Sequence, residues 1–100
     1  MMDVAGRFRI PAGHPCLPGH FPGRPVVPGV VLLDEVFAVL AVLHPGCALG
    51  GLPRVKFTHP VGPEQDVVVH AGPGEGGRVP FLCRVDGRDV LGGTMTFGPA

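Results

Sequence analysis

The sequence of 100 residues lacks tryptophan and tyrosine, and charged residues make up only 16% of it. Its eight basic and eight acidic residues cancel and form no basic run, so the chain lacks the charge pattern of a nucleic-acid-binding protein. Its longest apolar stretch, Val36 to Leu43, is far shorter than the roughly 20 residues of a membrane span. The first residues also lack the pattern of a secretion signal. We therefore expect a soluble, cytoplasmic protein with neither nucleic-acid nor membrane partners.

Cysteine is scarce as well. Cys16, Cys47 and Cys83 are odd in number, widely spaced and without a CxxC pair, so reduced thiols are expected rather than a disulfide framework. A zinc site could use His14, Cys16 and His20, but the sequence offers no obvious fourth ligand. We therefore predict no metal site.

Glycine and proline, by contrast, are abundant, with 17 and 13 residues. They separate segments of distinct character, so we interpret them as turn residues and the chain as a single domain over residues 1–100. Residues 11–29, rich in both, form a long loop of the kind that often carries function in small domains. A chain of this size buries roughly 60–70% of its unfolded surface, which permits one modest core.

One long helix is predicted after this loop. Pro28 suits the start of a helix, the run Val30–Leu43 is almost wholly apolar, and His44-Pro45-Gly46 is a stop signal. Because the run is apolar on nearly all sides, we expect other structure to surround the helix.

The rest of the chain predicts strands. A short strand is expected at Arg7–Ile10, and residues 86–89 carry a hairpin signal between the last two strands. After the helix we expect four strands: Leu52–Thr58, Asp66–Ala71, Arg78–Asp86 and Asp89–Phe97. This order predicts an α+β fold in which an antiparallel sheet curves around one helix.

Two adjacent charges interrupt the helical run. Asp34 and Glu35 point about 100° apart, so in a surrounded helix one reaches solvent more easily than the other. A buried carboxyl needs a partner or a raised pKa, which is how a general acid near neutral pH arises. Alternatively, both lie on one exposed edge near the helix N-terminus, where negative charge is favourable. The residues alone favour the exposed reading for Glu35 and leave Asp34 undecided.

His20 is the histidine most suited to chemistry. Gly19, Phe21-Pro22 and Gly23 restrict its backbone, and an imidazole near its ordinary pKa can move protons at neutral pH. The other histidines are expected to be solvated or structural: His14, His44, His59 and His70.

The predicted helix start offers a third element. The backbone N–H groups that follow Pro28, at Gly29 and Val30, have no partner within the helix and could receive an oxyanion. Glycine also allows a substrate to approach the backbone closely. A base, a carboxyl and an oxyanion site together suit proton abstraction next to a carbonyl.

These residues form one string, GHFPGRPVVPGVVLLDE, from Gly19 to Glu35. It resembles the pattern of 3-hydroxyacyl-acyl-carrier-protein dehydratases of the hotdog fold, with the acidic residue at the expected spacing. A second patch, Val55 to Pro63, looks like that family's K-F-x-x-P-V-x-P segment, and the resemblance covers roughly residues 7 to 97.

The resemblance implies roles for individual residues. His20 corresponds to the histidine that acts on the C2 proton, and Asp34 to the carboxyl that assists loss of the C3 hydroxyl as water. The N–H of Gly29, with that of Val30 beside it, would bind the thioester carbonyl. The motif loop comprises Phe21, Pro22, Gly23 and Pro28.

The resemblance also implies an assembly and a partner. In the family the histidine and the carboxyl of one site come from two subunits, so we expect a homodimer, alone or within a larger assembly. The substrate is carried on the phosphopantetheine of an acyl carrier protein, and no metal or redox cofactor is expected. Because carrier proteins are acidic, Arg24, Arg54 and Lys56 are candidate docking residues.

Two departures from the family pattern refine the expectation. Most single-function members have glutamate where Asp34 stands, and aspartate occurs in a branch that also isomerises. The short segment before His20 is more similar to the compact dehydratases of aryl-polyene and pigment pathways. Two other functions stay open, namely a hotdog acyl thioesterase and a non-catalytic module that binds acyl groups or carrier proteins.

Overall fold

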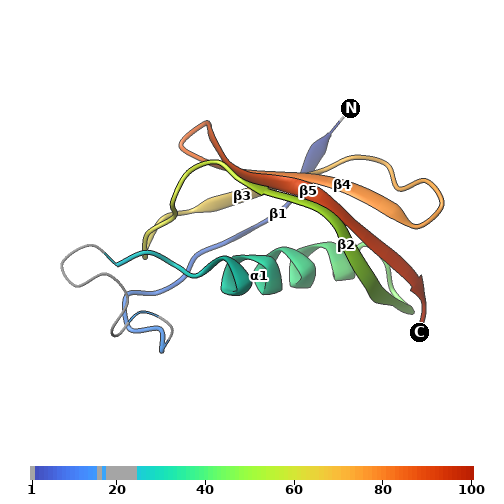
Figure 1. Cartoon of the computed structure of the whole chain (residues 1–100), viewed down its shortest axis with the longest axis horizontal. Helices are drawn as coiled ribbons and strands as arrows, with labels where there is room; N and C mark the ends of the chain where they lie inside the picture. The colour runs from blue at the N-terminus through green and yellow to red at the C-terminus, as the bar shows by residue number, and fades with distance from the viewer. Residues whose placement is uncertain (1, 16, 18–24) are drawn as a thin grey trace.

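The computed structural model describes residues 2–15, 17 and 25–100. Within these residues the chain forms one helix and a five-stranded sheet (Figure 1). Helix α1 spans Gly29–Val42, and the strands are β1 (Asp3–Phe8), β2 (Cys47–Phe57), β3 (Val67–Ala71), β4 (Arg78–Val85) and β5 (Arg88–Pro99).

The sheet is antiparallel throughout, in the order β1-β3-β4-β5-β2, and it arches over one side of α1 (Figure 1). Strands β1 and β2 are therefore the two edges. The predicted fold, an antiparallel sheet around one helix, is confirmed.

The two largest differences from the predicted strands are at the starts of β1 and β2. Strand β1 begins at Asp3 instead of Arg7, and β2 begins at Cys47 instead of Leu52. Gly6 and Gly51 lie at irregular pairings inside the longer strands, between Val4 and Gly6 in β1 and around Gly51 in β2. A glycine within a strand often marks a bulge.

The core lies between the sheet and one face of α1. Leu32, Val36 and Leu40, spaced four residues apart, are the buried residues of the helix. Alternate residues of β3, β4 and β5 face them; among these are Val67, Val69, Phe81, Cys83, Leu91 and Met95. Burial at every second residue is the ordinary pattern of a sheet with one covered face.

The expectation that α1 is surrounded is wrong for the single chain. Val30 and Val42 are 67% and 78% exposed, because a single sheet covers only one side of a helix. The apolar residues on the other side face outward. Within the described residues, no helix is long and apolar enough to cross a membrane.

Candidate active site

The start of α1 has the geometry that the sequence predicts. Pro28 is extended (φ −58°, ψ 143°), and its carbonyl accepts hydrogen bonds from the N–H groups of Val31 and Leu32 at 3.0 and 3.3 Å. The N–H groups of Gly29 and Val30 lie before these first helical bonds, where a helix supplies no acceptor of its own. They remain candidates to bind an oxyanion.

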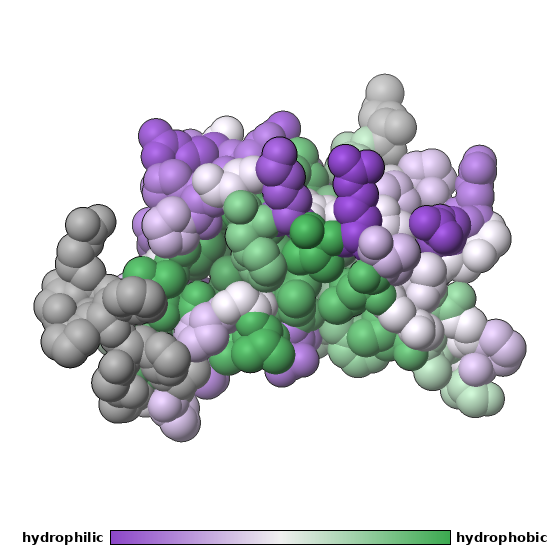
Figure 2. Space-filling view, in the orientation of Figure 1, coloured by the Kyte–Doolittle hydropathy of each residue, from purple (hydrophilic) through white to green (hydrophobic). Residues whose placement is uncertain are grey.

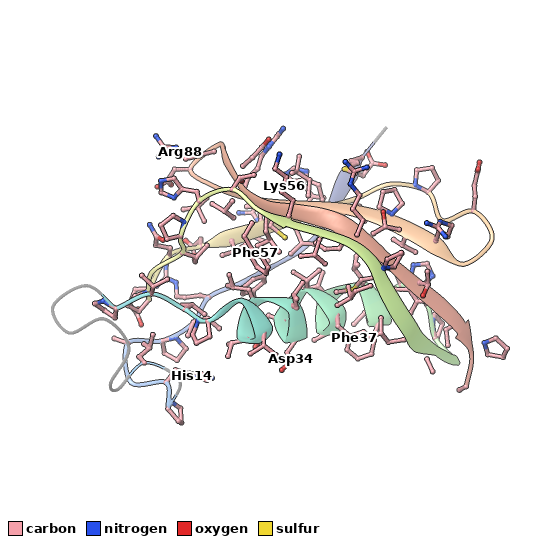
Figure 3. The ribbon with its side chains drawn as sticks, in the orientation of Figure 1. His14, Asp34, Phe37, Lys56, Phe57 and Arg88 are labelled. Carbon is pink, nitrogen blue, oxygen red and sulfur yellow. The ribbon has the colours of Figure 1, made fainter. Side chains whose placement is uncertain are left out.

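The aromatic ring of Phe57 packs directly against this helix start. A Cβ atom placed on Gly29 would lie 2.8 Å from Cζ of the ring, so only glycine fits without displacing the ring. Phe57 is 49% exposed, and its side chain lies between the sheet and the helix (Figure 3). Glycine at this place therefore lets α1 and β2 approach closely.

A groove runs past this contact and has a volume of about 510 Å³. Most of its lining is apolar, and polar groups enter it at one stretch after β2. The lining residues are Val26, Val27, Gly29, Leu32, Phe57, Thr58, His59, Pro60 and Val61. An apolar wall beside backbone N–H groups suits an acyl chain whose carbonyl binds the helix start.

A smaller hollow of about 250 Å³ adjoins the groove, and His59 and Pro60 line both. In it Nη1 of Arg88, at the start of β5, lies 2.7 Å from Nε2 of His59, and Nδ1 of His59 lies 2.9 Å from the carbonyl oxygen of Pro60. The groove is therefore apolar along α1 and polar toward the hairpin that joins β4 and β5.

The two helix carboxylates differ in exposure. Asp34 is exposed and Glu35 is half-buried. Figure 3 shows Asp34 on the side of α1 that faces away from the sheet, whereas Phe57 lies between the helix and the sheet. A single chain thus neither buries Asp34 nor brings it to the Phe57 groove.

Several predicted residues lie outside the part of the chain that the structure describes: His20, Phe21, Pro22, Gly23 and Arg24. Their roles stay predictions. Arg54 and Lys56 are described and exposed on β2. Lys56 points away from the helix, on the opposite face of the sheet from Phe57 (Figure 3).

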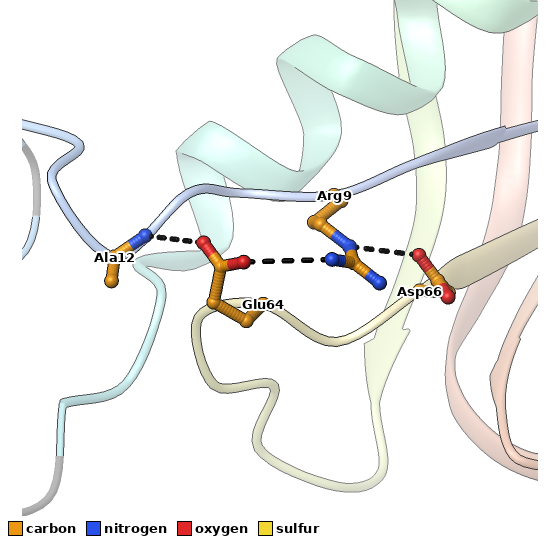
Figure 4. Close-up of polar contacts among 4 residues, drawn as sticks. All are labelled: Arg9, Ala12, Glu64 and Asp66. Atoms are coloured by element: carbon orange, nitrogen blue, oxygen red, sulfur yellow. Dashed lines mark hydrogen bonds and ion pairs between the residues drawn. The ribbon is translucent and has the colours of Figure 1, made fainter.

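A polar network fixes the chain just before the predicted histidine loop. Arg9 forms ion pairs with Asp66 at 2.9 Å and with Glu64 at 3.5 Å, and Glu64 accepts a hydrogen bond from the Ala12 N–H at 2.8 Å (Figure 4). The N–H of Glu64 also donates to the carbonyl of Ile10 at 2.8 Å. The hydrogen bond and charge of Arg9 lower the pKa of Asp66. The segment that leaves β1 is thus held against the loop before β3.

Of the described cysteines, Cys83 is buried and Cys47 is exposed, and neither lines the groove or the hollow beside it. Burial raises the pKa of the Cys83 thiol to about 12, which keeps it protonated and unreactive. No three His, Cys, Asp or Glu side chains of residues 2–15, 17 and 25–100 gather as metal ligands. Cys16 and His20, two members of the zinc hypothesis, are outside those ranges.

The sequence did not single out three residues of this region. Phe57 was part of a family-like strand, His59 was expected to be solvated or structural, and Arg88 was a turn residue. The signal for the first two was the stretch Val55–Pro63, which follows the family pattern. Nothing in the sequence marks Arg88 as a neighbour of His59, because 29 residues separate them.

Comparison with known proteins connects this geometry to a family. Residues 2–93 match the family described as "ApeI-like: ApeI dehydratase". Over 78 residues the chain is 35% identical to the 3-hydroxyacyl-acyl-carrier-protein dehydratase FabZ of Gluconacetobacter diazotrophicus, a match that covers 68% of this chain and 48% of that protein. The chain thus spans about half the length of that relative. It is 31% identical over 101 residues to FabZ of Thermus thermophilus, with 83% and 68% of the two chains covered.

Solved structures share the fold. A chain of the dehydratase heterocomplex ApeI:P from Xenorhabdus doucetiae superposes with a TM-score of 0.79 at 24% identity, over 91% of this chain and 82% of that one. A mutant of the fluoroacetyl-CoA-specific thioesterase FlK superposes with a TM-score of 0.61 at 20% identity, over 98% and 87%. The predicted hotdog fold is confirmed. Because a dehydratase and a thioesterase share it, the fold alone does not decide between the two activities.

Proposed function

The chain belongs to the ApeI-like dehydratase family, and we propose that it removes water from a 3-hydroxyacyl thioester on an acyl carrier protein to give the trans-2-enoyl thioester. The observation that carries the proposal is the groove at the start of α1. Its lining is mostly apolar and includes Gly29, which lies against Phe57 at the helix start. An acyl chain bound in the groove would have its carbonyl close to the Gly29 N–H, which supports the proposal.

The proposed reaction needs two proton transfers. The imidazole of His20 takes the C2 proton, and the thioester oxygen gains negative charge that the Gly29 N–H stabilises. The electron pair then forms the C2–C3 double bond while the C3–O bond breaks. The Asp34 carboxyl gives its proton to the departing hydroxyl, which leaves as water. Elimination of water causes no net oxidation or reduction, so the proposed reaction needs no redox cofactor. His20 and Asp34 supply the base and the acid without a metal, and phosphopantetheine serves only as the substrate's carrier.

We propose that the acid of each site comes from a second subunit of a homodimer. Asp34 is exposed on the side of α1 away from the Phe57 groove of its own chain. A partner helix that brings its Asp34 to this groove would complete the site.

The surface supports such a dimer. Figure 2 shows apolar surface gathered in a band below the row of hydrophilic side chains on the outer face of the sheet. Large apolar side chains are exposed on α1 and β2: Val30, Val42, Leu49, Leu52 and Phe57. A contiguous apolar surface next to an unpaired strand edge is typical of a protein interface.

Turnover of a carrier-linked 3-hydroxyacyl chain tests the activity, with mass spectrometry to detect loss of water and to place the double bond. We expect the wild type to form the 2-enoyl product. His20→Ala and Asp34→Asn should each lower kcat by about 10²–10⁴-fold, the usual contribution of a general acid or base.

Glu35→Gln is the matched control, because it removes the adjacent carboxylate without touching the proposed acid. Its activity should stay near that of the wild type. Release of free thiol from the thioester by the wild type would instead support the thioesterase alternative. Carrier-protein binding without turnover would support a binding module.

A further inference from the structure

The hollow beside the groove contains a cation without a carboxylate partner. Among residues 2–15, 17 and 25–100, Arg9 pairs with Glu64 and Asp66, and Arg84 pairs with Asp89. Within those ranges, Arg88 has no carboxylate oxygen within 4.0 Å, and its hydrogen-bond partner is the ring of His59. Its positive charge is therefore not neutralised locally.

His59, which Arg88 contacts, has a hydrogen-bond partner at each ring nitrogen. A carbonyl oxygen only accepts hydrogen bonds, so the 2.9 Å contact with Pro60 places a hydrogen on Nδ1 of His59. Nε2 is then the acceptor for Arg88 at 2.7 Å. The imidazole is thus neutral, and it orients the guanidinium without cancelling its charge.

The backbone holds this pair in place. The N–H groups of Thr58 and His59 donate to the carbonyl of Val90 at 2.9 and 3.3 Å, which ties the segment after β2 to the start of β5. The hydroxyl of Thr58 donates to the carbonyl of Asp89 at 3.0 Å. Arg88 and His59 therefore lie on two segments that hydrogen bonds join to each other.

The position of Arg88 and His59 beside the groove indicates which kind of ligand they can bind. The hollow also contains Gln65. Among the described residues of its lining, Asp86 is the one carboxylate, and it lowers but does not cancel the attraction for anions. His59 and Pro60 line both the hollow and the groove at the start of α1, so the two spaces adjoin each other. Figure 3 shows Arg88 at the same end of the molecule as the start of α1.

We propose that Arg88 binds the phosphate group of the phosphopantetheine arm that carries the substrate. This inference rests on the proposed function for the identity of the arm. The acyl chain lies along the apolar groove, the thioester carbonyl at Gly29, and the arm passes His59 to its phosphate at the guanidinium. A guanidinium presents several N–H donors in one plane, which suits a phosphate.

The test compares 4′-phosphopantetheine with pantetheine, two ligands that differ only by the phosphate. Calorimetry should show that the wild type binds the phosphorylated ligand about tenfold more tightly, as expected for a charge-assisted hydrogen bond at an accessible site. Arg88→Gln should bind both ligands with the affinity that the wild type has for pantetheine. Arg84→Gln is the matched control. It also removes a guanidinium from the β4–β5 hairpin, but that guanidinium is paired with Asp89 and lies outside the hollow. The Arg84→Gln variant should keep the tenfold preference for the phosphorylated ligand.

Equal binding of the two ligands by the wild type would overturn the inference, and so would an equal loss for both ligands in Arg88→Gln. Because binding is measured without turnover, an intact phosphate preference in a protein that forms no 2-enoyl product would contradict the proposed function alone. Both acyl carrier protein and coenzyme A contain the phosphopantetheine arm, and we assign the site to the carrier-linked form. A higher kcat/KM for the carrier-linked 3-hydroxyacyl group than for the coenzyme A thioester supports that assignment, and the reverse order contradicts it.

Discussion

The two edge strands of the sheet, β1 and β2, differ in length and in the side chains that they expose. Strand β1 has six residues, carries a bulge after Val4, and is followed by Arg9, which ion pairs anchor to the loop before β3. Strand β2 has eleven residues, nine of them exposed, and exposes the large apolar side chains Leu49, Leu52 and Phe57. A short edge resists pairing with another chain, whereas a long edge that exposes large apolar side chains invites it. We therefore expect β2, rather than β1, to pair with the second subunit of the proposed dimer.

Each edge strand also meets α1 at a glycine. A Cβ on Gly6 would lie 2.7 Å from Cγ1 of Val39, and a Cβ on Gly29 would lie 2.8 Å from the ring of Phe57. The first contact adjoins the core, since Val39 packs against it. The second lies on the groove, where the ring is half exposed. The absence of a side chain at Gly6 and at Gly29 therefore allows close packing against α1 at both edges. At Gly6 this packing supports stability, and at Gly29 it shapes the candidate site.

The largest expected effect comes from a charge at the middle of β2. Leu52 is the central residue of this strand and is 38% exposed. If two β2 strands pair antiparallel about a twofold axis near their centres, Leu52→Lys brings two like charges together and destabilises the pair. We expect a monomer in sedimentation experiments and loss of dehydratase activity, because the monomer lacks a partner's Asp34.

Val4→Lys on β1 is the matched control, because Val4 is also an exposed apolar residue on an edge strand, at 55%. It should remain dimeric and active. If Val4→Lys dissociates the protein and Leu52→Lys does not, the assignment of the two edges is reversed.

The next effect is on catalysis at the helix start. Gly29→Ala pushes the Phe57 ring away and shifts the N–H groups that we propose to bind the carbonyl. The kcat should therefore fall by about 10²-fold, comparable to loss of one oxyanion donor. The melting temperature should change little, since the half-exposed ring has room to move. Measured kcat near the wild-type value would show that this N–H site does not take part.

A smaller effect, on stability alone, is expected at the other glycine. Gly6→Ala forces the added methyl group against Val39 and should lower the free energy of unfolding by about 1–3 kcal/mol, the usual cost of overpacking. Denaturant unfolding measures it, and kcat below the unfolding transition should be unchanged. Gly13→Ala, where an added Cβ meets no atom within 4 Å, is the control and should leave the stability within experimental error.

The sequence predicts the helix and the order of the elements well, because Pro28, the apolar run and His44-Pro45-Gly46 are local signals. It does not predict that Gly6 and Gly51 lie inside strands, because the bulges there depend on the partner strands. The contact between Arg88 and His59 escapes prediction for the same reason. The sequence leaves the role of Asp34 undecided, because the exposure of its carboxyl depends on what covers α1. The sheet of a single chain covers only one side of this helix.

The smallest effect concerns the ion pair that anchors β1. Arg9 lowers the pKa of Asp66 below its ordinary value of 3.8, first through the hydrogen bond and then through charge. A carboxyl whose pKa is lowered on folding stabilises the folded state above the ordinary pKa, and this contribution is lost as the pH falls through the lowered value. Asp66→Asn should therefore melt slightly below the wild type at neutral pH, and the difference should shrink as the pH drops below about 4. Because both side chains are exposed, added salt should also shrink the difference. If the difference in melting temperature between Asp66→Asn and the wild type does not change with pH or salt, Asp66 acts through packing. The ion pair with Arg9 then does not stabilise the β1 edge.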